Sequence, residues 1–373
     1  METTKEQRPV RVIVSGGGTG GHVFPAIAIA DAIKKINPQA DILFVGAKDK
    51  IEMEKVPKAG YPIKGLWISG FHRKLTLRNL MFPIKLMSSL IKSGVILRRF
   101  RPAVVVGVGG FASGPVLDMA TRMGIPTLIQ EQNSYAGVTN RLLAKKVNRI
   151  CVAYDRMEKY FPAEKMRLTG NPVRADLKVA KADRAAAFQH YGFDPAKPTI
   201  CLFGGSLGAQ SLNEAMAANA KLLAQHPEVQ VLWQAGKLYI ERFQYCATAN
   251  LPNVQIHDFI DRMDLAYAMA DLVICRAGAL TISELCLLGQ PALLIPSPNV
   301  AEDHQSKNAL ALVDKEAAVL LPDCDAGTEM IHRALSLLGN QEKLNKLSEN
   351  ILRLARPKAA ADIAEEVLKL INH

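Results

Sequence analysis

The stretch SGGGTGGHVFP at residues 15–25 places five glycines and one histidine in eleven positions. Glycine loses more backbone freedom on folding than any other residue, so this run is costly unless something must approach the backbone closely. The stretch follows a predicted strand at 10–15 and precedes the helical pattern of 24–36. At such a corner the first helix amides lack partners, and the helix dipole favours negative charge. The run therefore predicts a loop that holds a phosphate group or a sugar hydroxyl.

Short runs rich in Val, Ile and Leu alternate with helical patterns along the whole chain. Continuous apolar strands of this kind are typical of a parallel sheet covered on both faces. The first half has predicted strands at 10–15, 41–46, 103–108, 127–130 and 149–153, with helices at 24–36, 77–99 and 136–146. The second half has predicted strands at 199–205, 229–234, 253–259, 271–276 and 291–296, with helices at 209–225 and 280–288. Two such series predict two doubly wound α/β domains.

The junction between the two series is predicted at 168–177, LTGNPVRADL, where Gly170, Asn171 and Pro172 interrupt both patterns. We therefore expect an N-terminal domain over residues 1–173 and a C-terminal domain over residues 174–354. The last segment, 357–373, has the pattern of one amphipathic helix. Periodicity alone does not say which domain this helix packs against.

The composition is that of an ordinary globular chain, with 49% hydrophobic and 22% charged residues. Its 373 residues suit two domains of about 100–200 residues each. The polar start and the lack of an apolar run of about 18 residues predict neither a signal peptide nor a membrane-spanning helix. The six cysteines are scattered without a C-x-x-C pair, which indicates reduced thiols in a cytoplasmic protein.

The formal charge of +11 is concentrated in one region. Between Glu54 and Asp118 the chain has eleven lysines and arginines and no acidic residue. Such an excess of positive charge attracts negative partners. An ordinary solvated helix, a nucleic-acid site and an anionic lipid surface are each consistent with it. The large aliphatic residues interleaved with the cations in 67–102 favour a lipid surface over a nucleic acid.

Two further glycine-rich loops follow predicted strands: a second loop, LFGGSLGAQ, at 202–210 and a third loop, VGVGGFASGP, at 106–115. One interpretation is that these glycines only permit tight turns between a strand and a helix. Three such loops at the carboxyl ends of strands favour a bound ligand, because open α/β sheets bind ligands at that edge.

The first loop also fits the dinucleotide pattern, with glycines at 16, 18 and 21. A dinucleotide site needs an acidic residue at the end of the second strand to bind the ribose. Gly46 and Ala47 occupy that place, and Asp49 comes slightly late. The pattern therefore disfavours NAD.

The segment CRAGALTISELCLLGQPALLIP at 275–296 is more specific. A strand is predicted to end at Arg276, and a helix to start near Ala279 with Glu284 in its first turns. Capping of the helix dipole is one interpretation of that carboxylate; the other is that it accepts two hydrogen bonds from a ribose diol. The segment 302–309, EDHQSKNA, adds amide, imidazole and carboxylate groups that suit sugar hydroxyls.

Six segments together resemble the MurG family: GGTGGHVFP (17–25), EQN (131–133), GNPVR (170–174), GGSLGA (204–209), RAGALTISE (276–284) and DHQ…NA (303–309). Members of this family are UDP-N-acetylglucosamine:lipid I N-acetylglucosaminyltransferases of bacterial cell-wall synthesis. The resemblance covers nearly the whole chain, with the motifs in the expected order and spacing. It implies a GT-B type fold, in which two Rossmann-like doubly wound parallel-sheet domains face each other across a cleft. It also implies that the last helix, 355–373, returns to the N-terminal domain.

The resemblance further implies a UDP-N-acetylglucosamine site in the C-terminal domain and a lipid acceptor site in the N-terminal domain. Carried over by motif, Ser206 would contact the diphosphate, Glu284 the ribose hydroxyls and the backbone at Ile260 the uracil edge. Gln305 would hold the sugar hydroxyls. The implied donor-binding residues are Thr19, Gly20, Gly21, Asn133, Arg174, Ser206, Ile260, Ala279, Leu280, Thr281, Ile282, Ser283, Glu284 and Gln305.

The implied reaction is an inverting transfer that converts lipid I to lipid II. The 4-hydroxyl of the muramyl sugar attacks C1 of N-acetylglucosamine, and UDP leaves. A base must take the hydroxyl proton, and positive potential must stabilise the departing diphosphate. His22 is the candidate base, since an unperturbed imidazole has a pKa of about 6.5; the alternative is that it only orients the acceptor or caps the helix.

No cofactor and no metal is expected. The one D-x-D pair, Asp323 and Asp325, lies in a predicted turn outside the family motifs. A helix N-terminus and a nearby serine can stabilise the diphosphate without a metal ion.

The resemblance gives the basic region a partner, the anionic membrane that carries the polyprenyl tail of the acceptor. Each cation near such a bilayer is worth about 1 kcal/mol. We therefore expect peripheral attachment to the cytoplasmic face of the cell membrane, and no nucleic-acid partner. The predicted membrane face comprises Trp67, Phe71, Arg73, Lys74, Leu75, Arg78, Met81, Phe82 and Lys85.

Three other functions remain open at this stage. A UDP-N-acetylglucosamine 2-epimerase shares the two-domain plan and the donor, but would not need a basic, apolar face. An NAD-linked oxidoreductase would show absorbance changes that depend on its nucleotide. A non-enzymatic binding protein would release no UDP when a lipid-linked muramyl acceptor is added.

Overall fold

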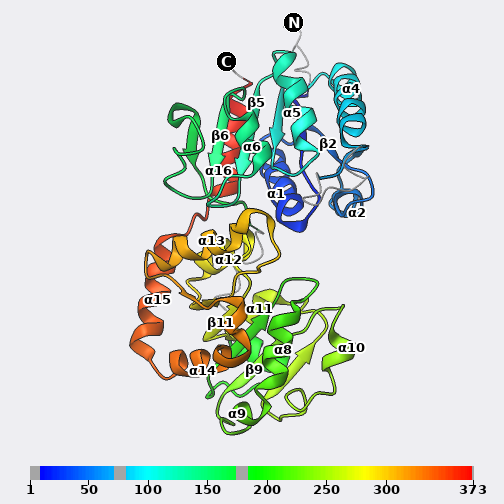
Figure 1. Ribbon diagram of the computed structural model, residues 1–373. Coiled ribbons are helices and arrows are strands. Elements are labelled where there is room, and N and C mark those ends of the chain that lie inside the picture. Colours follow the sequence, from blue (N-terminus) through cyan, green and yellow to red (C-terminus); the bar gives the residue numbers. More distant parts are fainter. Residues whose placement is uncertain (1–8, 71–80, 174–183, 372–373) are drawn as a thin grey trace, which may run out of the picture. The chain divides into compact units, whose positions relative to one another are not determined.

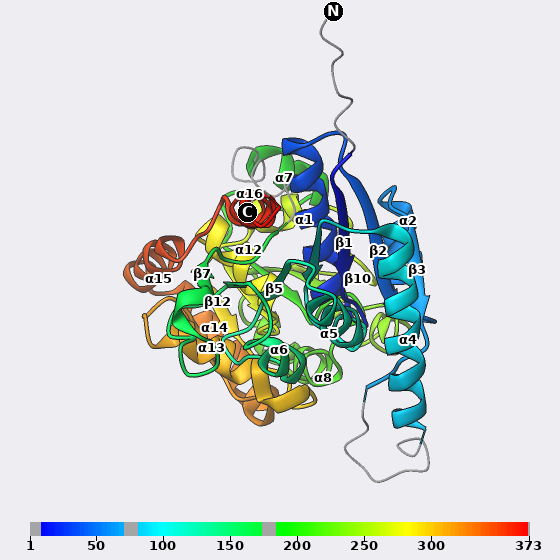
Figure 2. The same cartoon turned by 90° about the horizontal axis from the view of Figure 1, so that it is seen from above.

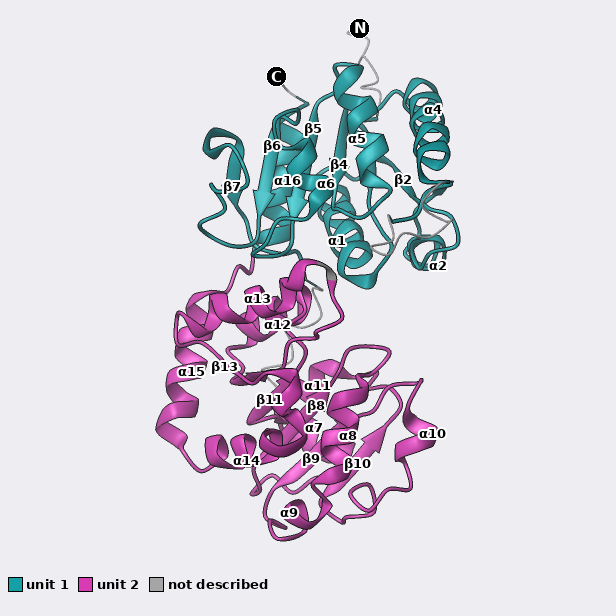
Figure 3. Ribbon diagram, viewed as in Figure 1, with its two compact units in different colours: residues 1–174, 358–373 teal, residues 175–357 magenta. Residues whose placement is uncertain are grey.

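The computed structural model describes residues 9–70, 81–173 and 184–371. The chain divides into two compact units (Figure 3). Unit 1 comprises residues 1–174 together with 358–373, and unit 2 comprises residues 175–357. Each unit is built on its own parallel sheet, and each is described here by itself.

Unit 1 is built on a seven-stranded parallel sheet with the order β3-β2-β1-β4-β5-β6-β7 (Figure 1). Its strands are β1 (Arg11–Ser15), β2 (Asp41–Ala47), β3 (Ile63–Leu66), β4 (Val104–Gly107), β5 (Thr127–Glu131), β6 (Arg149–Val152) and β7 (Met166–Leu168). Strand β1 lies in the middle, with Val12 opposite Ile42 of β2 and Val104 of β4. The chain runs outward in both directions from β1 and β4, so the loops after these strands form a topological switch point.

Helices cover both faces of this sheet (Figure 2). On one face of the sheet, alternate residues of β1 such as Val12 and Val14 pack against α1 and α16. On the opposite face, Ile13 and Val105 pack against α4, α5 and α6. Both faces of the strands are buried, which explains their continuous apolar sequences. The helices are α1 (Gly20–Ile36), α2 (Glu52–Lys58), α4 (Phe82–Phe100), α5 (Ser113–Arg122), α6 (Val138–Leu143) and α16 (Ala359–Lys369), with a 3₁₀ turn at Ala163–Lys165.

Unit 2 repeats the plan with six parallel strands in the order β10-β9-β8-β11-β12-β13. Its strands are β8 (Thr199–Phe203), β9 (Gln230–Gln234), β10 (Val254–His257), β11 (Leu272–Cys275), β12 (Ala292–Leu294) and β13 (Val319–Leu320). Its helices are α7 (Arg184–Tyr191), α8 (Gln210–Ala218), α9 (Ala220–Ala224), α10 (Ile240–Phe243), α11 (Met263–Met269), α12 (Ala279–Leu288), α13 (His304–Val313), α14 (Ala326–Leu338) and α15 (Gln341–Arg353), with 3₁₀ turns at Ala301–Asp303 and Asp323–Asp325. The switch point lies between β8 and β11.

The predicted fold class, two doubly wound parallel-sheet α/β domains, is confirmed. Three strands were not predicted. The segments of β3 (IKGL) and β7 (MRL) each contain a charged residue that interrupts the apolar run, and β13 has only two residues. The predicted helix at 209–225 is wrong in one respect: it breaks into α8 and α9 at Asn219. The Asn219 amide donates to the backbone oxygens of Ala215 and Gly327, and such side-chain bonds to the backbone compete with helix continuation.

Helix α1 also begins earlier than the predicted residue 24, at Gly20. Glycines and Pro25 are poor helix formers, so the sequence pattern understates the first turn of this helix. The helix packs along α16, which comes from the other end of the chain (Figures 1 and 2). Ile363, Ala364 and Val367 of α16 are buried in the same cluster as Ile29 and Ile33 of α1.

The substitution Ile363→Ala is expected to destabilise unit 1 by about 2–5 kcal/mol, because it leaves a cavity in this cluster. Hydrogen exchange in urea should show reduced amide protection in β1 and β4, while β8 and β11 of unit 2 keep theirs. Ile36→Ala is the control, since Ile36 is 47% exposed on α1 and its loss should cost less than about 0.5 kcal/mol. Equal loss of protection in both sheets would contradict this assignment of α16.

Candidate functional site

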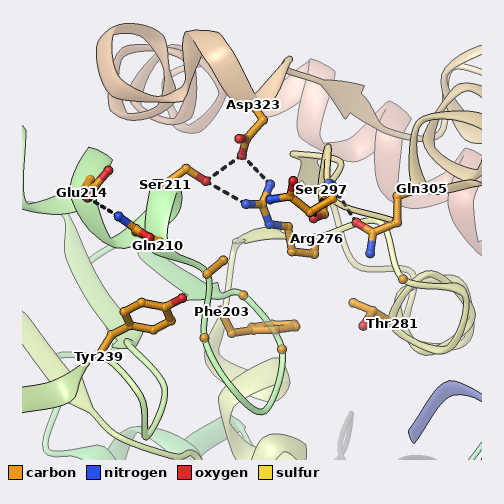
Figure 4. Close-up of a pocket in the computed structure, with 16 residues that line it drawn as sticks. Phe203, Gln210, Ser211, Glu214, Tyr239, Arg276, Thr281, Ser297, Gln305 and Asp323 are labelled. Carbon is orange, nitrogen blue, oxygen red and sulfur yellow. Dashed lines mark hydrogen bonds and ion pairs between the residues drawn. The ribbon is translucent and has the colours of Figure 1, made fainter. Parts of the chain in front are cut away.

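A pocket of about 510 Å³ lies at the carboxyl ends of β8 and β11 in unit 2, at its switch point (Figure 4). Loops after β8, β11 and β12 contribute to its wall, together with the start of α8. Open α/β sheets bind ligands at this position because the two central loops diverge there. The pocket therefore occupies the place that the fold makes available for a ligand.

The second glycine-rich loop forms one wall of the pocket through Gly204, Gly205 and Gly208. A Cβ at Gly204 would lie 2.4 Å from the Cβ of Ala209, and one at Gly208 would lie 2.0 Å from the Ala235 oxygen. These two glycines are thus required by packing of the chain on itself. Gly205 differs, because a Cβ there would meet nothing within 4 Å. Its φ of +92° is instead what favours glycine at this position.

Helix α8 begins directly after this loop, and no side chain caps its N-terminus. Gln210 and Ser211 of its first turn line the pocket. Buried Asn213 holds the helix to β9, since its amide donates to the Ala235 oxygen and its oxygen accepts from Nε1 of Trp233 at 2.9 Å. The first amides and the positive end of the α8 dipole are therefore held at the pocket wall.

An ion-pair cluster formed by Arg276, Asp323 and Ser211 lies at one side of the pocket, where the three side chains point toward one another (Figure 4). The Arg276 guanidinium donates to Asp323 Oδ1 at 2.5 Å and to Ser211 Oγ at 2.7 Å. Further bonds go to the backbone oxygens of Ile295 and Pro296. The guanidinium is therefore fixed in orientation before any ligand binds.

The same contacts decide the role of the D-x-D pair. Asp323 is 18% exposed and engaged with Arg276 and Ser211, whereas Asp325 lies at the end of the 3₁₀ turn. In the described part of the chain, no group of three or more His, Cys, Asp or Glu side chains is placed to hold a metal ion. Asp323 thus forms an ion pair with Arg276. That no metal ion is required stays a prediction.

Glu284 lies on α12 and accepts a hydrogen bond at Oε2 from the Tyr267 hydroxyl, at 3.0 Å. Burial and the nearby Glu284 charge raise the pKa of Tyr267 well above its usual value of 10.0. The phenol therefore stays protonated and remains a donor to Glu284. The Tyr267 ring also stacks edge-on against Phe203, which lines the pocket. Tyr267 is buried on α11, and its sequence position gave no signal of this role.

Gln234 was also missed by the sequence analysis. This buried side chain donates from Nε2 to the Gly205 oxygen and accepts at Oε1 from the Ile260 amide, both at 2.9 Å. It ends strand β9 and links the second glycine loop to the segment after β10. The Ile260 amide, which the family resemblance assigns to the uracil edge, is thus bonded to Gln234 in this structure.

The remaining predicted donor residues of α12 differ in their surroundings. Thr281 lines the pocket, Ile282 is buried, and the Ser283 hydroxyl donates to the Ala279 oxygen within the helix at 2.9 Å. Ala279 and Leu280 form the first turn and are half-buried. Of the predicted α12 residues, including Glu284, only Thr281 lines the pocket.

Gln305 lies on α13 at the edge of the pocket. Its Oε1 accepts from the Ser297 amide at 2.8 Å, which leaves the Nε2 group to face the pocket (Figure 4). Ser206 is exposed at the tip of the second glycine loop. Arg174 lies outside the described residues.

In unit 1 the first and third glycine loops meet. A Cβ at Gly110 would lie 2.3 Å from the Gly17 oxygen, and one at Gly109 would lie 2.9 Å from Cδ2 of His22. His22 is in the first turn of α1, and its Nδ1 lies 3.1 Å from Oγ1 of Thr19, the residue before the helix. Gly20 and Gly21 begin the same turn.

Asn133 follows β5 and is held by buried Glu131. That carboxylate accepts from the backbone amides of Asn133 and Gly137 and from the side chain of Asn140. Burial raises the pKa of Glu131, and these hydrogen bonds oppose the increase. Glu131 thus shapes the loop that carries Asn133.

The predicted membrane face is described only in part. Phe71, Arg73, Lys74, Leu75 and Arg78 lie outside the described residues. Trp67 and Met81 are 43% and 40% exposed, Phe82 and Lys85 are half-buried, and Lys85 lies 5.7 Å from the centre of the Trp67 ring. No helix among those described is both long and apolar enough to span a bilayer.

Comparisons with known proteins identify the family. The model of the glycosyltransferase family 28 N-terminal domain matches residues 12–152, and that of the C-terminal domain matches residues 199–367. A relative from Bacteroides fragilis is 55% identical over 363 residues, which is 97% of this chain and 96% of the relative. Its name is UDP-N-acetylglucosamine–N-acetylmuramyl-(pentapeptide) pyrophosphoryl-undecaprenol N-acetylglucosamine transferase. A relative with the same name from Flavobacterium psychrophilum is 54% identical over 97% of this chain and 98% of its own.

The chain belongs to the MurG family within glycosyltransferase family 28. Among solved structures, it resembles MurG of Acinetobacter baumannii, with 29% identity, a TM-score of 0.78 and coverage of 97% of this chain and 100% of that chain. A UDP-GlcNAc 2-epimerase from Neisseria meningitidis matches with a TM-score of 0.68 at 15% identity, over 97% of this chain and 100% of that chain. At that identity the epimerase shows the shared fold alone.

The ion-pair cluster of Arg276, Asp323 and Ser211 predicts different outcomes for two neighbouring aspartates. Asp323→Asn should lower the free energy of unfolding of unit 2 by about 1–3 kcal/mol, because it leaves a mostly buried guanidinium without its counter-charge. Asp325→Asn, in the same turn, should change it by less than about 0.5 kcal/mol. Urea unfolding, followed by amide protection in β8 and β11, measures both. Equal effects would contradict the structural role given to Asp323.

Proposed function

We propose that this chain transfers N-acetylglucosamine from UDP-N-acetylglucosamine to the 4-hydroxyl of the muramyl sugar of an undecaprenyl-linked acceptor, with inversion at C1. The product is lipid II. The observation that carries this proposal is the 55% identity to a transferase of that name over 97% of the chain. The pocket at the switch point of unit 2 provides a site of suitable chemistry for the donor.

The donor diphosphate is assigned to the N-terminus of α8. Its uncapped amides and helix dipole favour an anion, and the Arg276 guanidinium, paired with Asp323, lies beside Ser211. Negative charge on UDP grows as the bond to C1 breaks, so these groups stabilise the transition state more than the ground state. Ser206, exposed on the same loop, supplies a further hydroxyl donor.

Glu284 and Gln305 are assigned to the two sugar rings. Glu284 accepts from the ribose hydroxyls, while Tyr267 holds one of its oxygens. Gln305 donates from Nε2 to hydroxyls of N-acetylglucosamine, since its oxygen is engaged by the Ser297 amide. For the uracil edge to use the Ile260 amide, Gln234 must release it.

His22 is proposed as the base that takes the proton from the acceptor hydroxyl. This role needs a neutral imidazole with its proton on Nδ1, donated to Thr19 Oγ1, so that the Nε2 lone pair accepts. A role confined to orienting the acceptor is the alternative. His22→Ala distinguishes the two, because loss of a general base lowers kcat by about 10²–10⁴-fold.

The function is tested by measuring UDP release with and without a lipid-linked muramyl acceptor. UDP should appear, with transfer of the sugar, only when the acceptor is present, and EDTA should leave most of the activity. Appearance of N-acetylmannosamine would indicate an epimerase instead. Release of UDP at the same rate with and without the acceptor, or no release at all, would overturn the assignment.

The donor assignment predicts a specific effect of Tyr267→Phe. The KM for UDP-N-acetylglucosamine should rise about 2–10-fold, because one hydrogen bond that orients Glu284 is lost. Discrimination against the 2′-deoxyribose donor should shrink by a similar factor. Tyr245→Phe is the control, since Tyr245 is 80% exposed. Unchanged discrimination in Tyr267→Phe would remove Glu284 from the ribose site.

A peripheral membrane surface is proposed on α4, at the cytoplasmic face of the cell membrane. Ile84, Met87, Ile91 and Val95 are 56%, 59%, 63% and 41% exposed and recur at helical spacing on one side of α4. Lys85 and Lys92 lie among them, and Arg98 and Arg99 end the helix. An apolar stripe flanked by cations suits insertion into an anionic headgroup region. A solvated helix is the alternative.

Replacing Ile84, Met87 and Ile91 together by glutamine should lower binding to phosphatidylglycerol vesicles by at least about tenfold, because three apolar side chains no longer insert. Vesicle flotation measures this, with phosphatidylcholine vesicles for comparison. In a matched control, the exposed Leu238, Leu310 and Leu352 of unit 2 are replaced by glutamine, and vesicle binding should stay unchanged. Equal binding of the wild type and the triple variant to phosphatidylglycerol vesicles would exclude this surface.

A further inference from the structure

The first glycine-rich loop of unit 1 already contains an anion, the carboxylate of Glu52. Glu52 begins α2, after β2, and is only 1% exposed. Its Oε2 accepts from the Gly18 amide at 2.8 Å, and its Oε1 accepts from the Ala47 amide at 2.9 Å. Both oxygens are therefore bonded to backbone donors, one after β1 and one at the end of β2.

The glycines around this carboxylate are fitted to it. A Cβ at Gly17 would lie 2.2 Å from Cδ of Glu52, and a Cβ at Gly46 would lie 2.5 Å from its Cγ. Glu52 therefore requires a glycine at position 17, within the glycine run of residues 15–25.

A buried carboxylate is costly unless its hydrogen bonds compensate it. In the described part of the chain, Glu52 takes part in no ion pair, and its recorded hydrogen bonds come from backbone amides alone. Such charge-assisted bonds are strong and directional. They fix the Gly18 peptide, which immediately precedes Thr19 and the first turn of α1.

We propose that Glu52 is a positioning residue for the acceptor side of the transfer reaction. It takes the place of a phosphate oxygen at the Gly18 amide, so this amide does not bind the diphosphate of either substrate. It also holds the turn from Gly18 to His22, in which Oγ1 of Thr19 lies 3.1 Å from Nδ1 of His22. This inference rests on the proposed function, because it assigns the turn to the acceptor. It departs from the family resemblance, which implied donor contacts for Thr19, Gly20 and Gly21 of the same turn.

The chemistry of the contact defines the test. Glu52→Gln keeps the shape but turns one acceptor into an NH₂ group that faces a backbone N–H. Glu52→Ala leaves a space with two free amide donors, which formate can fill. The control is Glu54→Gln on the same helix, whose side chain is 58% exposed and pairs with Lys55 and Lys58.

In Glu52→Gln, kcat should fall by about 10–100-fold, because small misplacement of a reacting group has effects of that size. The KM for UDP-N-acetylglucosamine should stay within about twofold, since the donor pocket is in unit 2. Formate, but not chloride at equal ionic strength, should restore activity to Glu52→Ala. Hydrogen exchange should show faster exchange at residues 16–22 in Glu52→Ala and slower exchange once formate is added.

Several results would overturn the proposal. One is a lower melting temperature with unchanged kcat in Glu52→Gln, which would make Glu52 only a structural link between two loops. Another is a folded Glu52→Ala that formate does not restore. If both variants unfold, Glu52→Asp is measured; it keeps both acceptor oxygens but withdraws them by one methylene, and normal kcat there would also reject the proposal. Wild type and Glu54→Gln report on the transfer reaction itself, so failure of the proposed function is seen separately.

Discussion

Backbone amides at the corners where parallel strands pass into helices need acceptors, and this requirement organises both units. In unit 1 the chain supplies acceptors itself, through Glu52 at the loop after β1 and Glu131 at the loop after β5. In unit 2 the start of α8 has no side-chain cap and borders a pocket with Arg276. The same type of corner thus contacts an internal carboxylate in unit 1 and borders an open pocket in unit 2.

Polar groups in and near the unit 2 pocket are held in place by hydrogen-bonding partners. Arg276 is fixed by Asp323 and Ser211, Glu284 by Tyr267, and the second glycine loop by Gln234. Groups that are oriented before the ligand arrives need little reorganisation when charge develops on the leaving group.

The main elements were predictable because their signals are local. The apolar runs at β1, β4 and β8 are long enough to show a strand buried on both faces, and the glycines after β8 mark a corner in the sequence. Strand β13, with two residues, has no such signal. The break at Asn219 depends on a contact with Gly327, which lies 108 residues further along the chain.

The sequence by itself determined the two α/β series, the glycine corners and the family motifs, because periodicity and spacing between neighbours express them. Only the tertiary structure decided what each corner binds. Glu52 meets Gly18 across 34 residues, and Arg276 meets Ser211 across 65. These partners are chosen by strand order, which sets β2 beside β1 and β11 beside β8. Strand order results from packing of the whole sheet, so no local pattern records it.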